Sequence, residues 1–530
     1  MAAIQKDSTV QVEEFLEQSA GRFPEKTALV CADRRLSYRA IEAQSNRLGH
    51  GLASRGVQRG DRVAVYLDNS VEAVVSIFAI LKAGAVFIVV NPTTKVDKVI
   101  HVLNDSGAKI LITQSPKLAS MQSCWGHTPD VETVVVVGEK AENIGSATKN
   151  FVGWDELMAE HESRVEAPPK RAIDIDIAAL IYTSGSTGNP KGVVMTHLNM
   201  VAAATSVISY LENTSEDIIL NVLPLSSSYG LYQVLMGFKV GATVILERSL
   251  AYPHTLVERL VEERVTGLAV VPTVAAVLLQ LDLTQYRFPC LRYITNAGAA
   301  LPTQYVTKLR KLFPQTRLYL MYGLTECKRV SYLAPEQVER RPNSVGKAMP
   351  NTEVYIVDEN GRRLPAGHVG ELVVRGSTIM KGYWKLPEET AKMLKPGPVP
   401  GERVLYTGDL FRTDEEGYLY WVGRRDEMIK CRSEKVSPTE VENVLYSLPG
   451  VDMAAVIGVP HEVLGQAIKA VITLKPGAQL AENDVLRHCA RHLENFMIPT
   501  IVEFRATMPK TAAGKIDKRQ MAEEKEEAPQ

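Results

Sequence analysis

A loop rich in glycine and hydroxyl residues, with one lysine, lies near the middle of the chain. It follows the apolar segment 177–182, which reads as a buried strand, and its polar members are Thr183, Ser184, Gly185, Ser186, Thr187, Gly188 and Lys191. Backbone N–H groups and hydroxyls in such a loop can surround phosphate oxygens. A flexible linker is the alternative, since linkers have a similar composition. The apolar segments on both sides favour the phosphate site.

The loop does not follow the Walker pattern of P-loop ATPases. That pattern places Ser or Thr directly after Gly-Lys, whereas here the lysine stands between Pro190 and Gly192. A P-loop ATPase is therefore not indicated.

Two carboxylates and a second lysine stand in short motifs further along the chain. Glu326 ends the string Tyr-Gly-Leu-Thr-Glu, Asp409 follows a Thr-Gly turn, and Lys515 ends the string Pro-Lys-Thr-Ala-Ala-Gly-Lys. Each residue also has an ordinary interpretation as a solvated loop carboxylate, a turn aspartate or a surface lysine. Only their combination indicates a shared chemistry.

The segments that must position these residues alternate between helical and strand-like patterns. A helical period over 41–55 precedes the apolar strand 62–66, and a helix over 256–264 precedes a strand over 267–271. This alternation predicts an α/β fold with parallel strands. Short strands bounded by glycines over 354–374 predict an additional β-rich subdomain.

The character of the chain changes after the string Gly-Arg-Arg-Asp at 423–426. A helix near 438–447 and strands near 454–457 and 470–474 follow. We therefore predict a large N-terminal domain, 1–425, made of two α/β subdomains and the β-rich subdomain. A small, mobile α+β C-terminal domain covers 426–521, and the Glu-rich tail 522–530 is expected to be disordered.

The bulk composition excludes several classes of protein. The 530 residues include 60 Lys+Arg and 61 Asp+Glu, scattered along the chain, so nothing indicates a nucleic-acid partner. The six cysteines lie far apart, as in reduced proteins, and no export signal begins the sequence, so we expect a cytoplasmic location. The most apolar window, 71–90, contains two charges and a glycine, which favours a helix and a buried strand over a transmembrane segment.

Seven motifs, in order, resemble those of the AMP-forming acyl-CoA synthetases, a family that includes luciferases and the adenylation domains of peptide synthetases. They lie at 182–192, 296–300, 322–326, 370–372, 406–409, 423–426 and 509–515. The resemblance covers nearly the whole chain. It implies activation of a carboxylic acid by ATP as acyl-AMP, with release of pyrophosphate, and then transfer to the thiol of coenzyme A.

The resemblance also implies a role for each motif residue. Glu326 would bind Mg²⁺, which travels with ATP, and Lys515 would bridge the attacking carboxylate and the α-phosphate. Asp409 would accept hydrogen bonds from the ribose and Asp426 would be the hinge of the small domain. The remaining nucleotide-binding residues would be the loop 183–191 at the phosphates, together with Gly298, Ala299, Ala300, Tyr322, Gly323, Thr325 and Arg424.

Two positions depart from the pattern common in the family. Ser227 stands where many members have a histidine near the acid, and Ser433 stands where a glycine is expected beside the coenzyme A tunnel, which Lys430 and Arg432 would share. The expected acid pocket is mostly apolar, with Arg329 near its edge and walls formed by Tyr229, Val271, Pro272, Thr273, Asn296, Met321 and Cys327. An apolar pocket suits a fatty or aromatic acid better than an amino acid, whose ammonium group would need a carboxylate.

Two alternatives stay open from sequence alone. The adenylate could be passed to the phosphopantetheine of a carrier protein or to an amine instead of coenzyme A. A non-catalytic acyl- or nucleotide-binding protein is the alternative from another class, although the presence of Lys515, Glu326 and Asp409 disfavours it.

Overall fold

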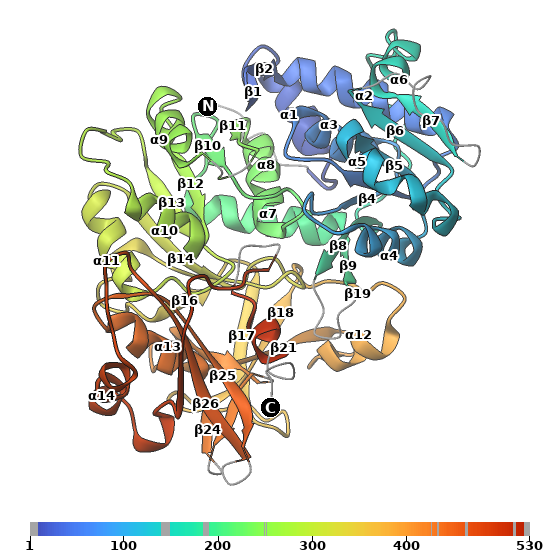
Figure 1. Ribbon diagram of the computed structural model, residues 1–530. Helices are drawn as coiled ribbons and strands as arrows, with labels where there is room; N and C mark the ends of the chain where they lie inside the picture. The colour runs from blue at the N-terminus through green and yellow to red at the C-terminus, as the bar shows by residue number, and fades with distance from the viewer. Residues whose placement is uncertain are drawn as a thin grey trace, which may run out of the picture.

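The computed structural model describes residues 9–138, 149–183, 190–248, 250, 252–425, 427–431, 434–461, 465–511 and 516–523. Figure 1 shows two α/β lobes side by side, with the C-terminal segment, in orange and red, packed below the lobe drawn in green and yellow. The predicted fold class is thereby confirmed, since large mixed sheets are followed by a separate small C-terminal sheet.

The first lobe is built on an eight-stranded sheet with the order β19-β9-β8-β4-β3-β5-β6-β7. Strands β3 to β8 pair in parallel, and β8 and β9 form an antiparallel pair. The strands are β3 (Arg62–Tyr66), β4 (Val86–Val89), β5 (Ala108–Gln114), β6 (Thr133–Val137), β7 (Asn150–Gly153), β8 (Ile177–Thr183), β9 (Lys191–Thr196) and β19 (Gly382–Tyr383). Its helices are α2 (Tyr38–Ser54), α3 (Val71–Lys82), α4 (Val96–Ser106), α5 (Ser115–Met121) and α6 (Trp154–Glu160).

The second lobe belongs to a fourteen-stranded sheet with the order β17-β18-β21-β22-β16-β15-β14-β13-β12-β10-β11-β1-β2, to which β20 adds at β21. Strands β1 and β10 to β14 pair in parallel and form the α/β part. They are β1 (Thr27–Cys31), β10 (Ile218–Asn221), β11 (Thr243–Leu246), β12 (Gly267–Val270), β13 (Tyr293–Asn296) and β14 (Arg317–Tyr322), with β2 (Arg34–Ser37) at the edge. Its helices are α1 (Glu14–Arg22), α7 (His197–Leu211), α8 (Ser228–Val240), α9 (Pro253–Glu262), α10 (Pro272–Gln280) and α11 (Thr303–Leu312).

The β-rich part is the antiparallel continuation of this same sheet. Strands β15 and β16 connect it to β14 through hydrogen bonds. Its elements are β15 (Ser331–Leu333), β16 (Ser344–Ala348), β17 (Thr352–Val357), β18 (Val369–Gly376), α12 (Pro387–Met393), β20 (Leu394–Pro396), β21 (Arg403–Thr413) and β22 (Leu419–Arg424). The sheet therefore runs without interruption from the α/β part to the β-rich part.

The small C-terminal part has its own five-stranded sheet with the order β24-β23-β26-β25, in which β27 pairs with β26. Its elements are β23 (Ile429–Cys431), β24 (Glu434–Val436), α13 (Pro438–Ser447), β25 (Val451–His461), β26 (Gly465–Leu474), α14 (Glu482–His492), β27 (Ile501–Phe504) and α15 (Lys518–Glu523). Helix α15 includes the first two residues of the expected tail, and 524–530 lie outside the described residues.

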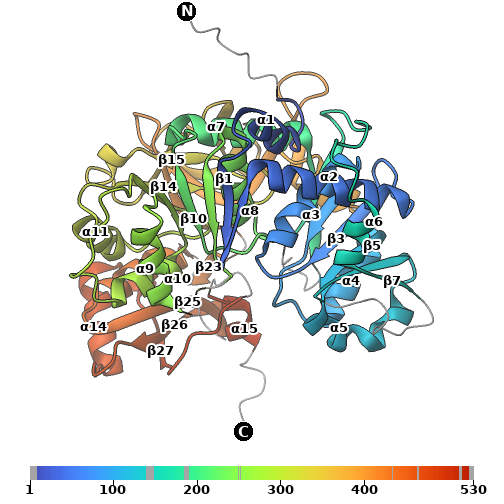
Figure 2. The same cartoon turned by 90° about the horizontal axis from the view of Figure 1, so that it is seen from above.

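Helices α3 and α8 occupy the space between the two large sheets, as Figure 2 shows in its centre. Their rings Phe78 and Phe238 stack with centroids 5.3 Å apart. All but one of the twelve residues of α3 are buried, which explains why the window 71–90 is so apolar. None of the described helices is long and apolar enough to cross a membrane.

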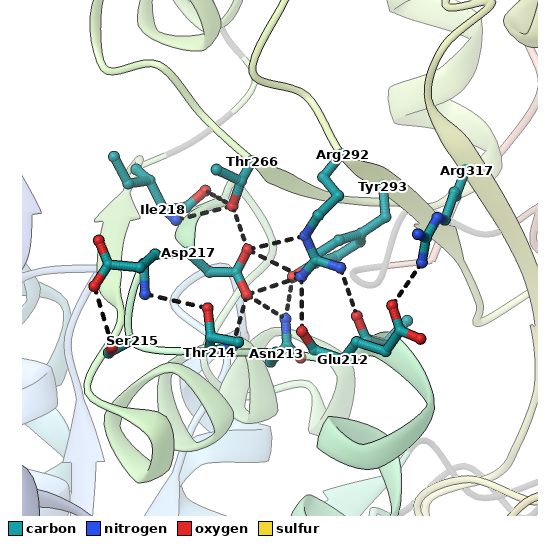
Figure 3. A network of polar contacts seen from close by, with 12 residues as sticks. Glu212, Asn213, Thr214, Ser215, Asp217, Ile218, Thr266, Arg292, Tyr293 and Arg317 are labelled. Atoms are coloured by element: carbon teal, nitrogen blue, oxygen red, sulfur yellow. Dashed lines mark hydrogen bonds and ion pairs between the residues drawn. The ribbon is translucent and has the colours of Figure 1, made fainter.

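A polar network ties together the amino ends of the parallel strands in the second lobe (Figure 3). Asp217, which directly precedes β10, is 3% exposed. It accepts hydrogen bonds from Arg292 Nη2 at 2.8 Å and from Thr266 Oγ1 at 2.7 Å, residues that directly precede β13 and β12. Asn213 Nδ2 donates to the same carboxylate at 3.2 Å and to Tyr293 Oη at 2.9 Å. The network fixes the strands at the end opposite their carboxyl termini.

Candidate active site

The predicted nucleotide and acid residues follow the carboxyl ends of neighbouring parallel strands. Strands β12, β13 and β14 pair in register, with Leu268 opposite Ile294 and Ile294 opposite Leu318. The motifs at 271–273, 296–300 and 322–327 begin where these strands end. Ligands of open α/β sheets bind at this edge of the sheet. The fold thus gathers motifs that are far apart in sequence.

Tyr322, Asp409 and Arg424 meet in one cluster, although they come from three different strands. The Tyr322 hydroxyl donates to Asp409 Oδ2, and Arg424 Nε lies 3.3 Å from Asp409 Oδ1. Asp409 of β21 and Arg424 of β22 are also register partners. Burial, followed by the Asp409 charge, raises the pKa of Tyr322, so this hydroxyl keeps its proton and remains a donor.

The turn before Asp409 is held by side chains of the adjacent strands. Gly408 has φ 72°, in the left-handed region that favours glycine. Its N–H donates to Glu371 Oε1 at 2.9 Å, and Thr407 Oγ1 donates to the Leu372 carbonyl at 2.9 Å. These bonds fix the direction in which the Asp409 carboxylate points.

Glu326 is positioned by a residue from a distant part of the chain. Tyr383 Oη donates to Glu326 Oε1 at 2.7 Å, and the Met380 N–H donates to the Glu326 carbonyl at 2.7 Å. Tyr383 belongs to β19, which pairs with β9 directly after the glycine-rich loop. The contact therefore links the Glu326 motif to the predicted phosphate loop. Thr325, the preceding residue, is half-buried.

Strands β8 and β9 flank the predicted phosphate loop, with Thr183 opposite Lys191. Lys191 Nζ lies 2.6 Å from Glu389 Oε2, on α12. This contact and a second one from Lys392 lower the pKa of Glu389 to about 2. The charge of Lys191 is thus balanced by a surface carboxylate in this structure. Gly298, Ala299 and Ala300, the expected adenine edge, are exposed.

Most residues of the expected acid pocket are buried. Tyr229, Asn296, Met321 and Cys327 are at most 7% exposed, while Val271 and Thr273 are half-buried. Tyr229 Oη donates to the Thr295 carbonyl at 2.9 Å, which holds the ring against β13. Burial raises the pKa of Tyr229 to about 12 and that of the Cys327 thiol still further, so both stay neutral.

Ser227, at the place of the family's histidine, caps helix α8. Its Oγ accepts from the Gly230 N–H at 3.0 Å and donates to the Pro224 carbonyl at 2.9 Å. Serine is among the best N-cap residues because its oxygen satisfies an N–H that has no partner within the helix. The departure at this position therefore has a structural reason.

Several predicted residues fall outside the described residues: Ser184, Gly185, Ser186, Thr187, Gly188, Asp426, Arg432, Ser433 and Lys515. Lys430 lies on β23, whose partner strand β24 begins at Glu434. The roles expected for all of these residues stay predictions.

The structure adds partners that the sequence reasoning missed. Tyr383 and Glu389 contact predicted site residues from far along the chain, and no local pattern indicates them. Lys328 and Arg329, directly after the Glu326 motif, are both buried. The sequence placed Arg329 near the edge of the expected acid pocket but indicated neither its burial nor that of Lys328.

No group of three or more His, Cys, Asp or Glu side chains suited to a metal occurs within the described ranges. Mg²⁺ commonly binds through one or two carboxylates and the phosphates of its substrate, not in an all-protein cage. Glu326, a half-buried carboxylate linked to the loop strands through Tyr383, fits that mode.

Comparison with known proteins gives one consistent result. A long-chain-fatty-acid–CoA ligase of Bacillus subtilis (strain 168) is 30% identical, covering 97% of this chain and 95% of that protein. The anthranilate CoA ligase AuaEII, solved with anthranoyl-AMP, has a TM-score of 0.88 at 27% identity over 97% of both chains. ATP-bound MatB from Rhodopseudomonas palustris has a TM-score of 0.84 at 27% identity, over 98% of this chain and 99% of that one.

The AMP-binding enzyme family matches residues 16–384, and the AMP-binding enzyme C-terminal domain matches residues 440–515. All of the predicted motifs lie within these two ranges or between them. The chain belongs to the AMP-binding enzyme family.

Proposed function

We propose that this protein is an AMP-forming acid–thiol ligase that activates a carboxylic acid with ATP and passes the acyl group to coenzyme A. The observation that carries the proposal is the meeting of Tyr322, Asp409 and Arg424 at the carboxyl edge of the parallel strands. An aromatic ring, a carboxylate and a guanidinium are the groups that an adenosine needs for stacking and for its ribose hydroxyls. Three separate motifs converge there.

The chemistry requires compensation of negative charge. The acid's carboxylate attacks the α-phosphate of ATP, so two anions approach while pyrophosphate departs. Lys191 and Lys515 supply positive charge on the protein side, and Thr325 donates to the α-phosphate. Mg²⁺ held by Glu326 and the phosphates would neutralise part of the remaining charge. Preorganised charges of this kind are usually the largest contribution to catalysis.

The acid itself is proposed to have an apolar body, fatty or aromatic. Tyr229, Met321 and Cys327 are buried and apolar over most of their surfaces. Among the described residues of this cluster, no carboxylate is placed to pair with the ammonium of an amino acid. The body of the acid would therefore be recognised by burial of apolar surface.

The second half-reaction is proposed to follow a rotation of residues 426–521 against 1–425. The boundary is supported by the fold, because β22 ends at Arg424 and the separate five-stranded sheet begins at Ile429. Closure about a few boundary residues is a common way to rearrange an active site.

We include a cytoplasmic location in the proposal, since all six cysteines are unpaired, as in reducing compartments.

The test is pyrophosphate release from ATP with a panel of carboxylic acids, with and without coenzyme A. We expect release to depend on the acid and thioester to appear only with coenzyme A. Release of phosphate instead of pyrophosphate, or no dependence on any acid, would contradict adenylation. Acid-dependent release with acylation of a carrier protein or an amine, but not of coenzyme A, would contradict only the proposed acceptor.

A further inference from the structure

Lys328 and Arg329 form a pair of consecutive cations that the fold buries beside the expected acid pocket. They are 4% and 2% exposed, whereas lysine and arginine are almost never fully buried without a partner. Arg329 Cζ lies 5.0 Å from the ring centroid of Tyr229, and Lys328 Nζ lies 5.5 Å from the same centroid. Both charges thus contact a residue already assigned to the acid.

Neither cation forms an ion pair with a carboxylate in the part of the chain that the structure describes. Lys328 Nζ donates to the Ser228 carbonyl at 2.7 Å and lies 4.2 Å from the Tyr232 ring centroid. Arg329 Nε is buried without a hydrogen-bond partner. A guanidinium has five N–H donors. Cation–π contacts return about 0.5–2 kcal/mol, less than the several kcal/mol that burial of an ion costs.

The immediate surroundings make the pair less favourable still. Ser228, which Lys328 contacts, begins α8, and a helix N-terminus carries partial positive charge. The Lys328 backbone has φ 62°, a left-handed conformation that costs a non-glycine residue roughly 1–2 kcal/mol. Strain of this kind persists at binding sites, where the ligand or the surrounding structure offsets it.

The nearest functional carboxylates have other partners. Glu326 accepts from Tyr383, and Asp409 contacts Tyr322 and Arg424. Neither lies within ion-pair distance of the buried cations. The balancing negative charge must therefore come from outside the described protein.

We propose that the acid substrate carries a second anionic group, a carboxylate in the simplest case, which Arg329 and Lys328 bind while the first carboxylate is adenylated. This inference rests on the proposed function and refines its substrate class to a dicarboxylic acid with an apolar body. The Tyr229 ring contacts the body of the acid, and the two cations bind its far end. A planar guanidinium suits this task because it can hold a carboxylate through two parallel hydrogen bonds.

The experiment compares dicarboxylic acids of increasing length, linear and aromatic, with the monomethyl ester of each. Acid-dependent pyrophosphate release is measured for the natural protein, Arg329→Met, Arg329→Lys and the exposed control Arg39→Met. We expect a higher kcat/KM for the diacid than for its ester. Arg329→Met should lower kcat/KM for the diacid by roughly 10- to 100-fold, the size of a charge-assisted hydrogen bond, and change the ester little. Arg329→Lys should retain part of the preference for the diacid over its monomethyl ester.

A second measurement separates binding from a merely structural role. Diacids should raise the melting temperature of the natural protein, and their monoesters should not. Arg329→Met should lose this response and should melt at a higher temperature than the natural protein without ligand, because it removes an unpaired buried charge. If Arg329→Met does not fold, the inference is contradicted, since the charge is then needed for stability.

The outcomes distinguish the inference from the function on which it rests. Pyrophosphate release with monocarboxylic acids or monoesters, at rates equal to or above those with diacids, contradicts the second anion and leaves adenylation standing. No release with any acid contradicts the proposed function as well.

Discussion

Glu326 is held by a hydrogen bond from Tyr383 to one of its two oxygens. An ionised carboxylate offers about four lone-pair sites, so one such bond orients the group without using up its capacity for a cation. Tyr383 acts here as a positioning residue. Burial and the Glu326 charge raise its pKa, so the hydroxyl stays a donor at neutral pH.

Glu326→Gln should raise the Mg²⁺ concentration needed for half-maximal pyrophosphate release by roughly tenfold, because an amide is a weaker ligand for a hard cation. The measurement is a Mg²⁺ titration at saturating ATP. Tyr383→Phe is the matched control, since it removes only the positioning bond and should shift the titration less. An unchanged titration in the glutamine variant would remove Glu326 from the metal site.

Lys515→Ala should slow acyl-AMP formation by roughly 10²- to 10³-fold, because the charge that the lysine offsets develops in the first transition state. Thioester formation from supplied acyl-AMP should be largely spared. The two half-reactions are measured separately, as an overall rate would not show which one changed. Equal loss of both would contradict this role.

At the scale of elements, two buried polar clusters hold the frame that carries the site. One is the Asp217 network at the amino ends of β10, β12 and β13. The other joins α1 to α7, where Glu13 Oε2 lies 3.4 Å from His197 Nδ1 and both residues are at most 3% exposed.

Asp217→Asn should lower the free energy of unfolding by roughly 2–4 kcal/mol, because Arg292 would keep its charge and lose its bidentate partner. Urea unfolding gives this value. Glu212→Gln, in the exposed pair with Arg317 drawn beside it in Figure 3, is the control and should lower the free energy of unfolding much less, because exposed ion pairs contribute little. Equal costs for the two changes would show that Asp217 does not anchor the strands.

Glu13→Gln should produce a pH-dependent gain in stability. Burial raises the pKa of Glu13 from 4.5 to about 7. The buried Glu13 carboxyl must therefore ionise as the pH rises from below 4.5 through 7, and the natural protein loses stability over this range. A glutamine at this position does not ionise, so the variant does not lose this stability. The variant should match the natural protein at the low end of this window and exceed it by on the order of 3 kcal/mol once the pH is above the raised pKa.

The measurement for Glu13→Gln is denaturant unfolding across this pH range. His197, whose pKa burial lowers from 6.5 to about 4, destabilises both proteins as the pH falls between those two values. The titration of His197 therefore does not cause the difference in stability that we expect between the natural protein and the variant above the raised pKa of Glu13. A constant difference between the two proteins across the range would contradict the raised pKa of Glu13.

Local patterns predicted many elements well. The strand 62–66 and the helix 438–447 have the predicted bounds, because a short apolar run and the pair Ser437-Pro438, a cap followed by the first helical residue, are local signals. The join of the β-rich strands to the α/β sheet through β15 and β16 could not be predicted, since strand pairing depends on distant residues. For the same reason the partners Tyr383 and Glu389 were missed.

Family motifs predicted the chemistry of the site, and comparison with known proteins confirmed the family and the class of enzyme. The convergence of Tyr322, Asp409 and Arg424 is consistent with the roles expected for them, which stay proposals. The partners of a charge cannot be read from spacing. Sequence reasoning therefore placed Arg329 at the edge of an apolar pocket without indicating that the guanidinium is buried and unpaired.

At the scale of the whole molecule, the two proposed half-reactions require two arrangements of the C-terminal part. In this structure α11 contacts α13, and Gln304 Nε2 donates to the Tyr446 carbonyl at 2.8 Å. Polar contacts of this kind between domains are easily exchanged for water, so motion between the domains is the default expectation. The connection between β22 and β23, residues 425–428, would have to absorb the rotation.

Asp426→Pro should separate the half-reactions, because proline fixes φ near roughly −65° at a residue that must change its backbone angles. Asp426 lies outside the described residues, so its present φ does not enter the prediction. We expect the variant to retain one half-reaction near its natural rate and to lose most of the other. Single-turnover assays measure acyl-AMP formation from ATP and acid, and thioester formation from supplied acyl-AMP.

Asp426→Ala, which removes the carboxylate and keeps the backbone free, is the control and should retain both half-reactions. Normal overall turnover in the proline variant would contradict rotation about this residue, and equal loss in both variants would show that the carboxylate matters instead of the backbone.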